Sequence, residues 1–237
     1  SAVSEVIGQL ADAVERGAGE ALVGILAVGP GVDPPRHEGS IAPQLLLVVK
    51  RLPLPVLSNL AHQLQQIAGD ARVRILTERE LLRGADVFAL ELAEYRARHR
   101  VVRGRNPLDD LHYTAGELRL GIERSLRMLT RDLRDAMLAG PSLDVFAQGL
   151  DQLAVVAAHL LPLVGPDAGG EAATPSDSEQ ALLAALGRRV GHATEELERL
   201  RVMVRRGDEV SPFEAVAALL ALAKAATPLI DAFGADD

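Results

Sequence analysis

The sequence contains no cysteine and no tryptophan, and aromatic residues make up only 3% of its 237 residues. Without cysteine the chain can form no disulfide, no thiolate zinc site and no cysteine nucleophile. With so few aromatic rings, the core has to be filled by Leu, Val, Ile and Ala, since hydrophobic residues still make up 48% of the chain. A chain of this length can bury such a core in one large domain or in two small ones.

Basic residues are also few relative to acidic ones, because 25 Lys and Arg stand against 33 Asp and Glu and give a net charge of −8. Phosphate neutralisation needs clustered Lys and Arg, so a nucleic-acid partner is not expected. No uninterrupted apolar run reaches the ~18–20 residues of a membrane span. The N-terminus lacks a basic segment ahead of a long apolar core. We therefore expect a cytoplasmic protein with no membrane partner.

The first part of the chain alternates short apolar runs with segments of helical spacing, which predicts an α+β unit over residues 1–108. The apolar runs predict strands at residues 21–28, 41–49, 73–76 and 87–102. Helical spacing predicts helices at residues 2–16 and 53–68 and a short one after Thr77, where Glu80 completes a capping box. Residues 29–40 are rich in Gly and Pro and are expected to form a loop.

From residue 109 the pattern is helical throughout, which predicts a helical bundle over residues 109–237. Expected helices include a long one through Leu118 to Met137 and others at residues 142–163, 178–206 and 212–233. Residues 165–177 have the composition of a flexible linker. The fold class is thus a mixed sheet of three to five strands with flanking helices, followed by an all-α bundle.

The region after residue 87 contains a series of sequence motifs that also occurs in a known superfamily. The chain reads FALELAE over residues 88–94, RVVRGRNPL over residues 100–108 and ELR over residues 117–119. In this order the segment resembles the DNA polymerase β-like nucleotidyltransferases, and in particular the bacterial two-domain members with a C-terminal helical bundle. The resemblance implies a sheet that carries three carboxylates, which hold two Mg²⁺ ions on a nucleoside triphosphate.

The front half departs from that family pattern. Gly29-Pro30 stands where the family has Gly-Ser, and residues 42–46 read Ala-Pro-Gln-Leu-Leu where the family has Ser-Asp-x-Asp-Leu. Pro43 and Leu45 offer no side-chain oxygen to a metal, and Gln44 offers one neutral carbonyl. The resemblance is therefore to a degenerate member that lacks the Asp-x-Asp metal site, and no metal-ligating set is assigned.

Two carboxylates remain as candidate catalytic residues, Glu91 and Glu94, which alone would hold one ion weakly. Gly29 and Gln44 are the candidate cofactor-binding positions, because they stand where the family motifs would be. Asp33, Glu38 and Asp70 lie in or beside loops and could replace the missing aspartates, although their spacing does not indicate it.

The one basic cluster consists of Arg96, Arg98, Arg100, Arg103 and Arg105. In an extended strand the first three would share a face, at a spacing that suits phosphates or an acidic partner. The simpler interpretation is a solvated edge strand whose charges discourage aggregation.

Two functions of different class follow. The first is an inactive nucleotidyltransferase-fold protein, not an enzyme and without a cofactor, that acts as a binding or regulatory module for a protein partner or a small ligand in an interdomain cleft. The alternative is an active Mg²⁺-dependent nucleotidyltransferase with rearranged carboxylates that acts on a small molecule or a protein. A third reading is a structural bundle that forms a homodimer through the alanines of residues 215–225.

Overall fold

The computed structural model describes residues 2–29, 32, 44–65, 72–84, 87–165, 173–175 and 177–232, with side chains from residue 7 onward. The described residues divide into two compact units, and the sequence passes from one to the other between Tyr113 and Thr114. The first unit is an α+β unit built on a sheet, and the second is entirely helical. This is the predicted fold class.

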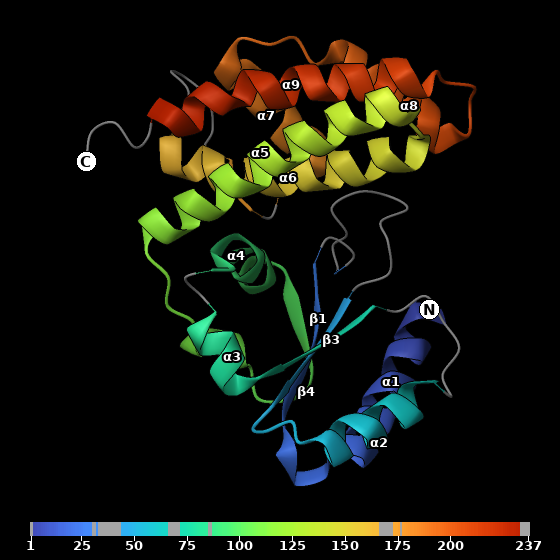
Figure 1. Ribbon diagram of the computed structural model, residues 1–237, viewed down its shortest axis with the longest axis vertical. Coiled ribbons are helices and arrows are strands. Elements are labelled where there is room, and N and C mark those ends of the chain that lie inside the picture. The colour runs from blue at the N-terminus through green and yellow to red at the C-terminus, as the bar shows by residue number, and fades with distance from the viewer. Residues whose placement is uncertain are drawn as a thin grey trace. The chain divides into compact units, whose positions relative to one another are not determined.

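The sheet of the α+β unit has four strands in the order β3-β2-β1-β4 (Figure 1). They span Leu22–Val28 for β1, Gln44–Val49 for β2, Val73–Thr77 for β3 and His99–Gly104 for β4. β1 is antiparallel to both β2 and β4, while β2 and β3 are parallel. The two central strands are nearly continuous apolar runs because both of their faces are covered.

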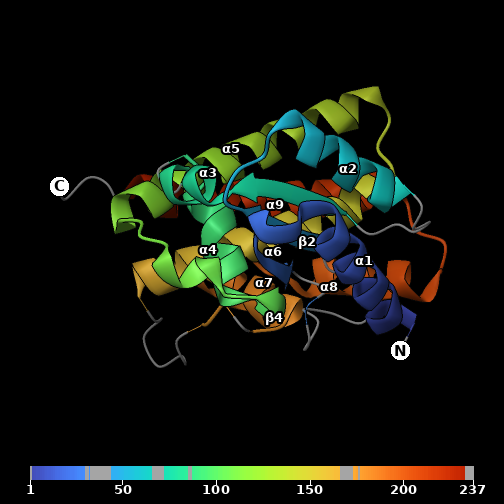
Figure 2. The same ribbon diagram turned by 90° about the horizontal axis from the view of Figure 1, so that it is seen from below.

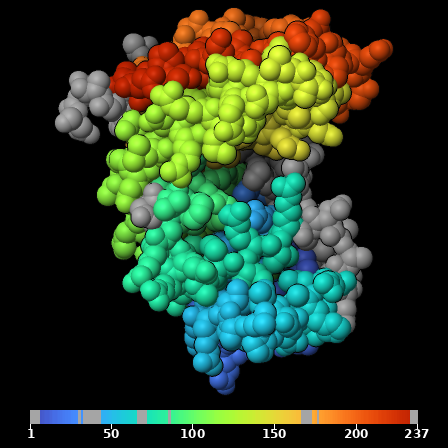
Figure 3. Space-filling view, in the orientation of Figure 1, coloured from blue at the N-terminus to red at the C-terminus, as the bar shows by residue number. Residues whose placement is uncertain are grey.

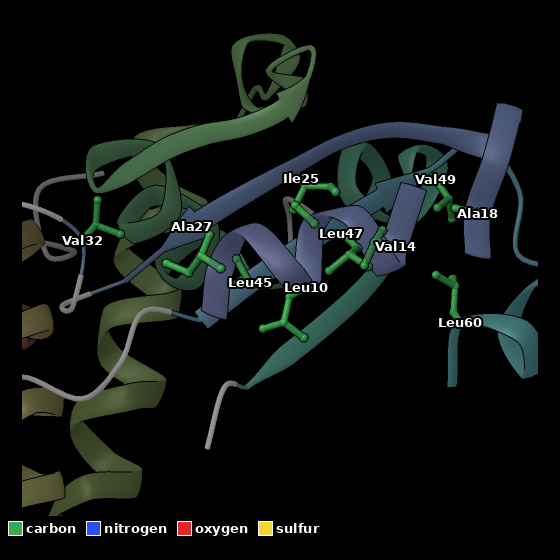
Figure 4. Packing of buried hydrophobic residues seen from close by; sticks show 12 residues of the cluster. Leu10, Val14, Ala18, Ile25, Ala27, Val32, Leu45, Leu47, Val49 and Leu60 are labelled. Atoms are coloured by element: carbon green, nitrogen blue, oxygen red, sulfur yellow. The ribbon is translucent and has the colours of Figure 1, made fainter. Parts of the chain in front are cut away.

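One face of the sheet packs against α1 (Ala2–Ala18) and α2 (Leu54–Gln65), which lie side by side (Figures 1 and 2). The cluster on this face includes Leu10 and Val14 from α1, Leu45 and Leu47 from β2, and Leu60 from α2 (Figure 4). Because successive side chains of a strand point to opposite faces, the residues between them form a second core.

That second core lies on the side of α3 (Glu78–Arg83) and α4 (Ala89–Ala97). It contains Leu46 and Val48 from β2, Leu81 from α3, and Leu92 and Tyr95 from α4. Thr77 caps α3 with the predicted capping box, since its hydroxyl accepts from Glu80 N at 3.1 Å while the Glu80 carboxylate accepts from Thr77 N at 2.7 Å.

The prediction of one long strand over residues 87–102 is wrong. Its first part is helix α4, and only His99–Gly104 forms strand β4. The sequence of α4, ALELAEYRA, consists almost entirely of strong helix formers. Its apolar residues alternate locally, but Ala89, Leu92 and Tyr95 also recur at helical spacing and are buried together.

The helical unit contains α5 (Ala115–Ala139), α6 (Leu143–Val164), α7 (Glu179–Val190), α8 (Glu195–Arg206) and α9 (Pro212–Ala232). α5 and α9 lie side by side at its surface (Figure 3). The prediction of a single helix over residues 178–206 is wrong, because Gly191 ends α7 in the left-handed conformation with φ of 63°. Glycine adopts that conformation at little cost and often ends a helix.

Helices α6 and α9 are each long and apolar enough, by mean hydropathy, to cross a membrane. Neither helix contains an uninterrupted apolar run of that length, because scattered polar residues interrupt both. In α6, 56% of the most apolar window is buried within the protein, and the core helices of soluble proteins pass the same test. Hydropathy alone therefore does not assign either helix to a membrane.

Candidate functional site

The candidate site lies at the end of the sheet where β1 finishes and β2, β3 and β4 begin. Val28, the last residue of β1, pairs with Gln44 on one side and with His99 on the other. Gly29 follows with φ of 88°, a conformation that favours glycine. Its amide N–H donates to the backbone carbonyl of Arg98 at 3.1 Å, which ties the end of β1 to the start of β4.

Four polar side chains meet beside this end of the sheet: Gln44 from β2, Arg74 from β3, and Glu91 and Tyr95 from α4. The Tyr95 hydroxyl donates to Glu91 Oε1 at 2.7 Å and lies 3.4 Å from Gln44 Oε1. The same Glu91 oxygen forms an ion pair with the guanidinium of Arg74. Glu91 and Tyr95 are four residues apart on α4, so both side chains lie on the same face of the helix.

The environment of Tyr95 favours its neutral form. Burial raises the pKa of Tyr95 strongly, and the hydrogen bond to the Glu91 carboxylate raises it further. The phenol therefore stays protonated, and its O–H donates the shorter of its two hydrogen bonds, the one to Glu91. Glu91 thus accepts a hydrogen bond from Tyr95 and a charged contact from Arg74, and its negative charge is compensated without a metal.

The register of β2 decides which of its residues can reach this cluster. Leu45 is fully buried on the opposite face, in the core with α1, whereas Gln44 lies within reach of Tyr95. A metal-binding carboxylate on the α4 side of β2 would thus stand at position 44. Among the described residues, no group of three or more His, Asp and Glu is placed to hold a metal ion. Pro43, Asp33, Glu38 and Asp70 lie outside the described residues.

Glu94, the second candidate carboxylate, is 4% exposed on the buried side of α4. Its backbone carbonyl accepts from Arg98 N at 2.9 Å at the end of the helix. Arg98 is 6% exposed, and its Nη2 donates to the carbonyl of Val32 at 3.2 Å. The side chain of Arg98 therefore fixes the chain just after β1, while Glu94 belongs to the interior of the unit.

The expectation that Arg96, Arg98 and Arg100 share one face is wrong, because α4 ends between them. Arg96 lies in the last turn of α4 and donates to the carbonyl of Leu111 at 3.3 Å. Arg98 is buried, and Arg100 is exposed on β4. The strand geometry on which the phosphate-spacing argument depended is therefore absent for these three residues.

The remaining two arginines of the basic cluster make ion pairs at the surface. Arg103 lies 3.4 Å from Asp12 and 3.8 Å from Glu15, both on α1. Arg105 contacts Glu78 and lies 2.8 Å from Asp110. β4 is an edge strand, so these contacts fit the simpler interpretation of charges along a sheet edge.

Sequence reasoning did not select Arg74 or Tyr95 as site residues. Tyr95 carried a usable signal, because it is one of only two tyrosines and follows Glu91 by one helical turn. That signal depends on recognising α4 as a helix. Arg74 gave no local signal, since its contact with Glu91 spans 17 residues of sequence.

No protein-family model and no curated protein sequence matches this chain. Among solved structures, it is similar to the spectinomycin adenyltransferase AAD(9) from Enterococcus faecialis, solved with ATP and spectinomycin. The TM-score is 0.58 at 14% sequence identity, over 93% of this chain and 99% of that one. The chain therefore has a nucleotidyltransferase-like fold.

Proposed function

We propose that this chain is a nucleotidyltransferase-fold binding module that does not transfer nucleotides. The observation that carries the proposal is the composition of the Gln44–Arg74–Glu91–Tyr95 cluster. The position of β2 that faces α4 holds a neutral amide, and the carboxylate opposite it is occupied by an arginine and a phenol. Two-metal phosphoryl transfer requires carboxylates that are free to bind Mg²⁺.

The first ligand to test is a nucleoside triphosphate, because the similar structure AAD(9) was solved with ATP. The Arg74 side chain is 44% exposed, so a triphosphate can replace Glu91 as its ion-pair partner, and binding of a nucleotide would then not need a divalent cation. A protein partner or another small ligand is the next class to test if no nucleotide binds.

The test measures thermal stability with each of the four nucleoside triphosphates, with and without Mg²⁺. In parallel it measures pyrophosphate release with spectinomycin as the first acceptor, because AAD(9) was solved with that molecule beside ATP. Saturating ligand at a hundred times its Kd adds ~2.7 kcal/mol, which for a chain of this size raises Tm by roughly 5–11 °C. We expect the same increase in Tm with Mg²⁺ and with EDTA, and we expect no release of pyrophosphate. Pyrophosphate release that requires Mg²⁺ would refute the proposal and establish the alternative, an active transferase acting on a small molecule or a protein.

A designed variant makes the test sharper. The double substitution Gln44→Asp with Arg74→Ala places a second carboxylate beside Glu91 and removes the competing guanidinium. We expect it to bind Mn²⁺, detected by the loss of the free-ion electron paramagnetic resonance signal, more tightly than the unmodified chain. Lys50→Ala, which removes a positive charge just beyond the far end of β2, is the matched control and should leave Mn²⁺ binding unchanged. Equal binding by all three proteins would contradict the assignment of the site.

A further inference from the structure

A separate cavity lies within the helical unit, between α7 and α8. Its volume is about 170 Å³. An apolar cavity of ~150 Å³ holds one benzene molecule, so this cavity has room for one compact ring. Its apolar wall is formed by Leu183 and Ala184 from α7 and Leu197 from α8. Two of these side chains, Leu183 and Leu197, are each only 4% exposed, so the wall is part of the packed interior.

The polar side of the cavity is built on a buried guanidinium. Arg201 is 6% exposed and lines the cavity together with Glu198. Arg201 Nε donates to Glu198 Oε2 at 2.6 Å, and Arg201 Nη1 lies 3.5 Å from Glu179. Glu179, which is 1% exposed, also binds Arg205. This network contains two carboxylates and two guanidiniums, so its own charges compensate each other.

Glu195 adds a charge that the network does not compensate. It lines the same cavity and is exposed to solvent at its mouth. Among the described residues, no cation lies within ion-pair distance of Glu195. The charged side chains that line the cavity are Glu195, Glu198 and Arg201, which leaves a net charge of −1 beside an apolar wall.

We propose that this cavity binds a small organic cation, a primary ammonium attached to a compact apolar body. The apolar body lies against Leu183, Ala184 and Leu197, and the ammonium contacts Glu195 at the mouth. An anion would be repelled by the negative charge of Glu195, and a neutral molecule of the same size would gain the apolar contacts alone, without an ion pair to Glu195. This site is in the helical unit and does not depend on the cluster around Gln44.

The test uses cyclohexylammonium chloride as the probe and cyclohexanol as its neutral counterpart of the same size. Amide ¹H–¹⁵N chemical shifts of the full chain are followed up to about 50 mM probe, a range that covers the millimolar affinities of fragment-sized ligands. We expect saturable shifts at Ala184, Thr194 and Glu195 with the cation, and about two- to fivefold weaker binding of cyclohexanol. Equal binding of the two probes, or no saturation, would overturn the proposal.

Two variants and one control locate the binding site. Glu195→Gln removes the charge at the mouth without touching the buried network, and it should weaken binding of the cation about two- to fivefold. Glu196→Gln removes the neighbouring charge, which pairs with Arg199 outside the cavity and should leave the affinity unchanged. Ala184→Phe fills the cavity and should abolish binding, with the helical circular dichroism signal confirming that the variant is folded. Unchanged binding in Glu195→Gln or in Ala184→Phe would show that the probe binds elsewhere.

Discussion

Glu179 is the side chain whose removal should destabilise the helical unit most clearly. It begins α7, is 1% exposed, and pairs with Arg205 and with the buried Arg201. Removing one partner of a buried ion pair costs ~3–5 kcal/mol, because the other charge stays buried without compensation. Arg201 keeps its contact with Glu198, so we place Glu179→Gln at the lower end, about 3 kcal/mol.

Glu196→Gln is the matched control, because Glu196 and Arg199 form an ion pair in which both side chains are more than half exposed. Surface pairs contribute ~0.2–1 kcal/mol. Urea denaturation followed by circular dichroism should therefore separate the two variants by about 2 kcal/mol, at unchanged m-value. If both substitutions change the free energy of unfolding equally, the buried network does not stabilise the fold as argued. The double variant with Arg205→Gln should show a coupling energy of ~0.5–3 kcal/mol.

Three further predictions concern packing, ionisation and capping. In Gly149→Ala the new Cβ would lie 2.6 Å from Leu219 Cδ2, so overpacking of ~1–3 kcal/mol should outweigh a gain of ~1 kcal/mol in helix propensity. Gly116→Ala is the control and should not destabilise the protein, because its nearest neighbour lies 3.9 Å away. Equal urea midpoints for the two variants would contradict this prediction. Because burial raises the pKa of Tyr95, the stabilisation from the neutral phenol is complete below the ordinary pKa of 10.0 and is lost as pH rises through the pKa of the folded state. An alkaline titration of phenolate absorbance should therefore contain a late step that is absent in Tyr95→Phe. If the late step persists in Tyr95→Phe, it belongs to the other tyrosine. The hydrogen bond from the Thr114 backbone N–H lowers the pKa of Glu117 below its ordinary value of 4.5. The cap therefore stabilises α5 fully above pH 4.5, and this stabilisation is lost as pH falls through the pKa of the folded state. Glu117→Gln should flatten the acid side of the curve of stability against pH, and an unchanged curve would refute the contribution of the cap.

The parts of the fold that the sequence predicts correctly are those with an unambiguous period or cap. The strands at β1, β2 and β3 follow from short apolar runs bounded by turn residues. The cap of α3 follows from Thr77 and Glu80 alone, since a capping box is local. The same box recurs at Thr114 and Glu117 at the start of α5, where the sequence analysis did not identify it.

The errors lie where a local pattern fits two structures. The segment ALELAEYRA alternates over its first residues, as a strand would, yet its buried residues also recur every three or four positions. The helix propensity of the segment and the neighbouring core, which includes Leu46, Leu81 and Leu108, together favour the helix. Arg96 lies in this segment and Arg98 and Arg100 follow it, so the predicted common face of these three arginines was wrong as well.

The position of Gln44 shows why the site itself could not be read from the sequence. After Gln44 the strand reads LLLVV, which is apolar throughout because both faces of β2 are covered, so it carries no alternation that tells one face from the other. A shift of one residue moves every side chain to the opposite face. The sequence therefore could not decide whether position 44 or 45 faces α4. The contact between Tyr95 and Gln44 shows that position 44 faces α4. A carboxylate at position 44 would therefore lie beside Glu91, whereas one at position 45 would be buried in the core with α1.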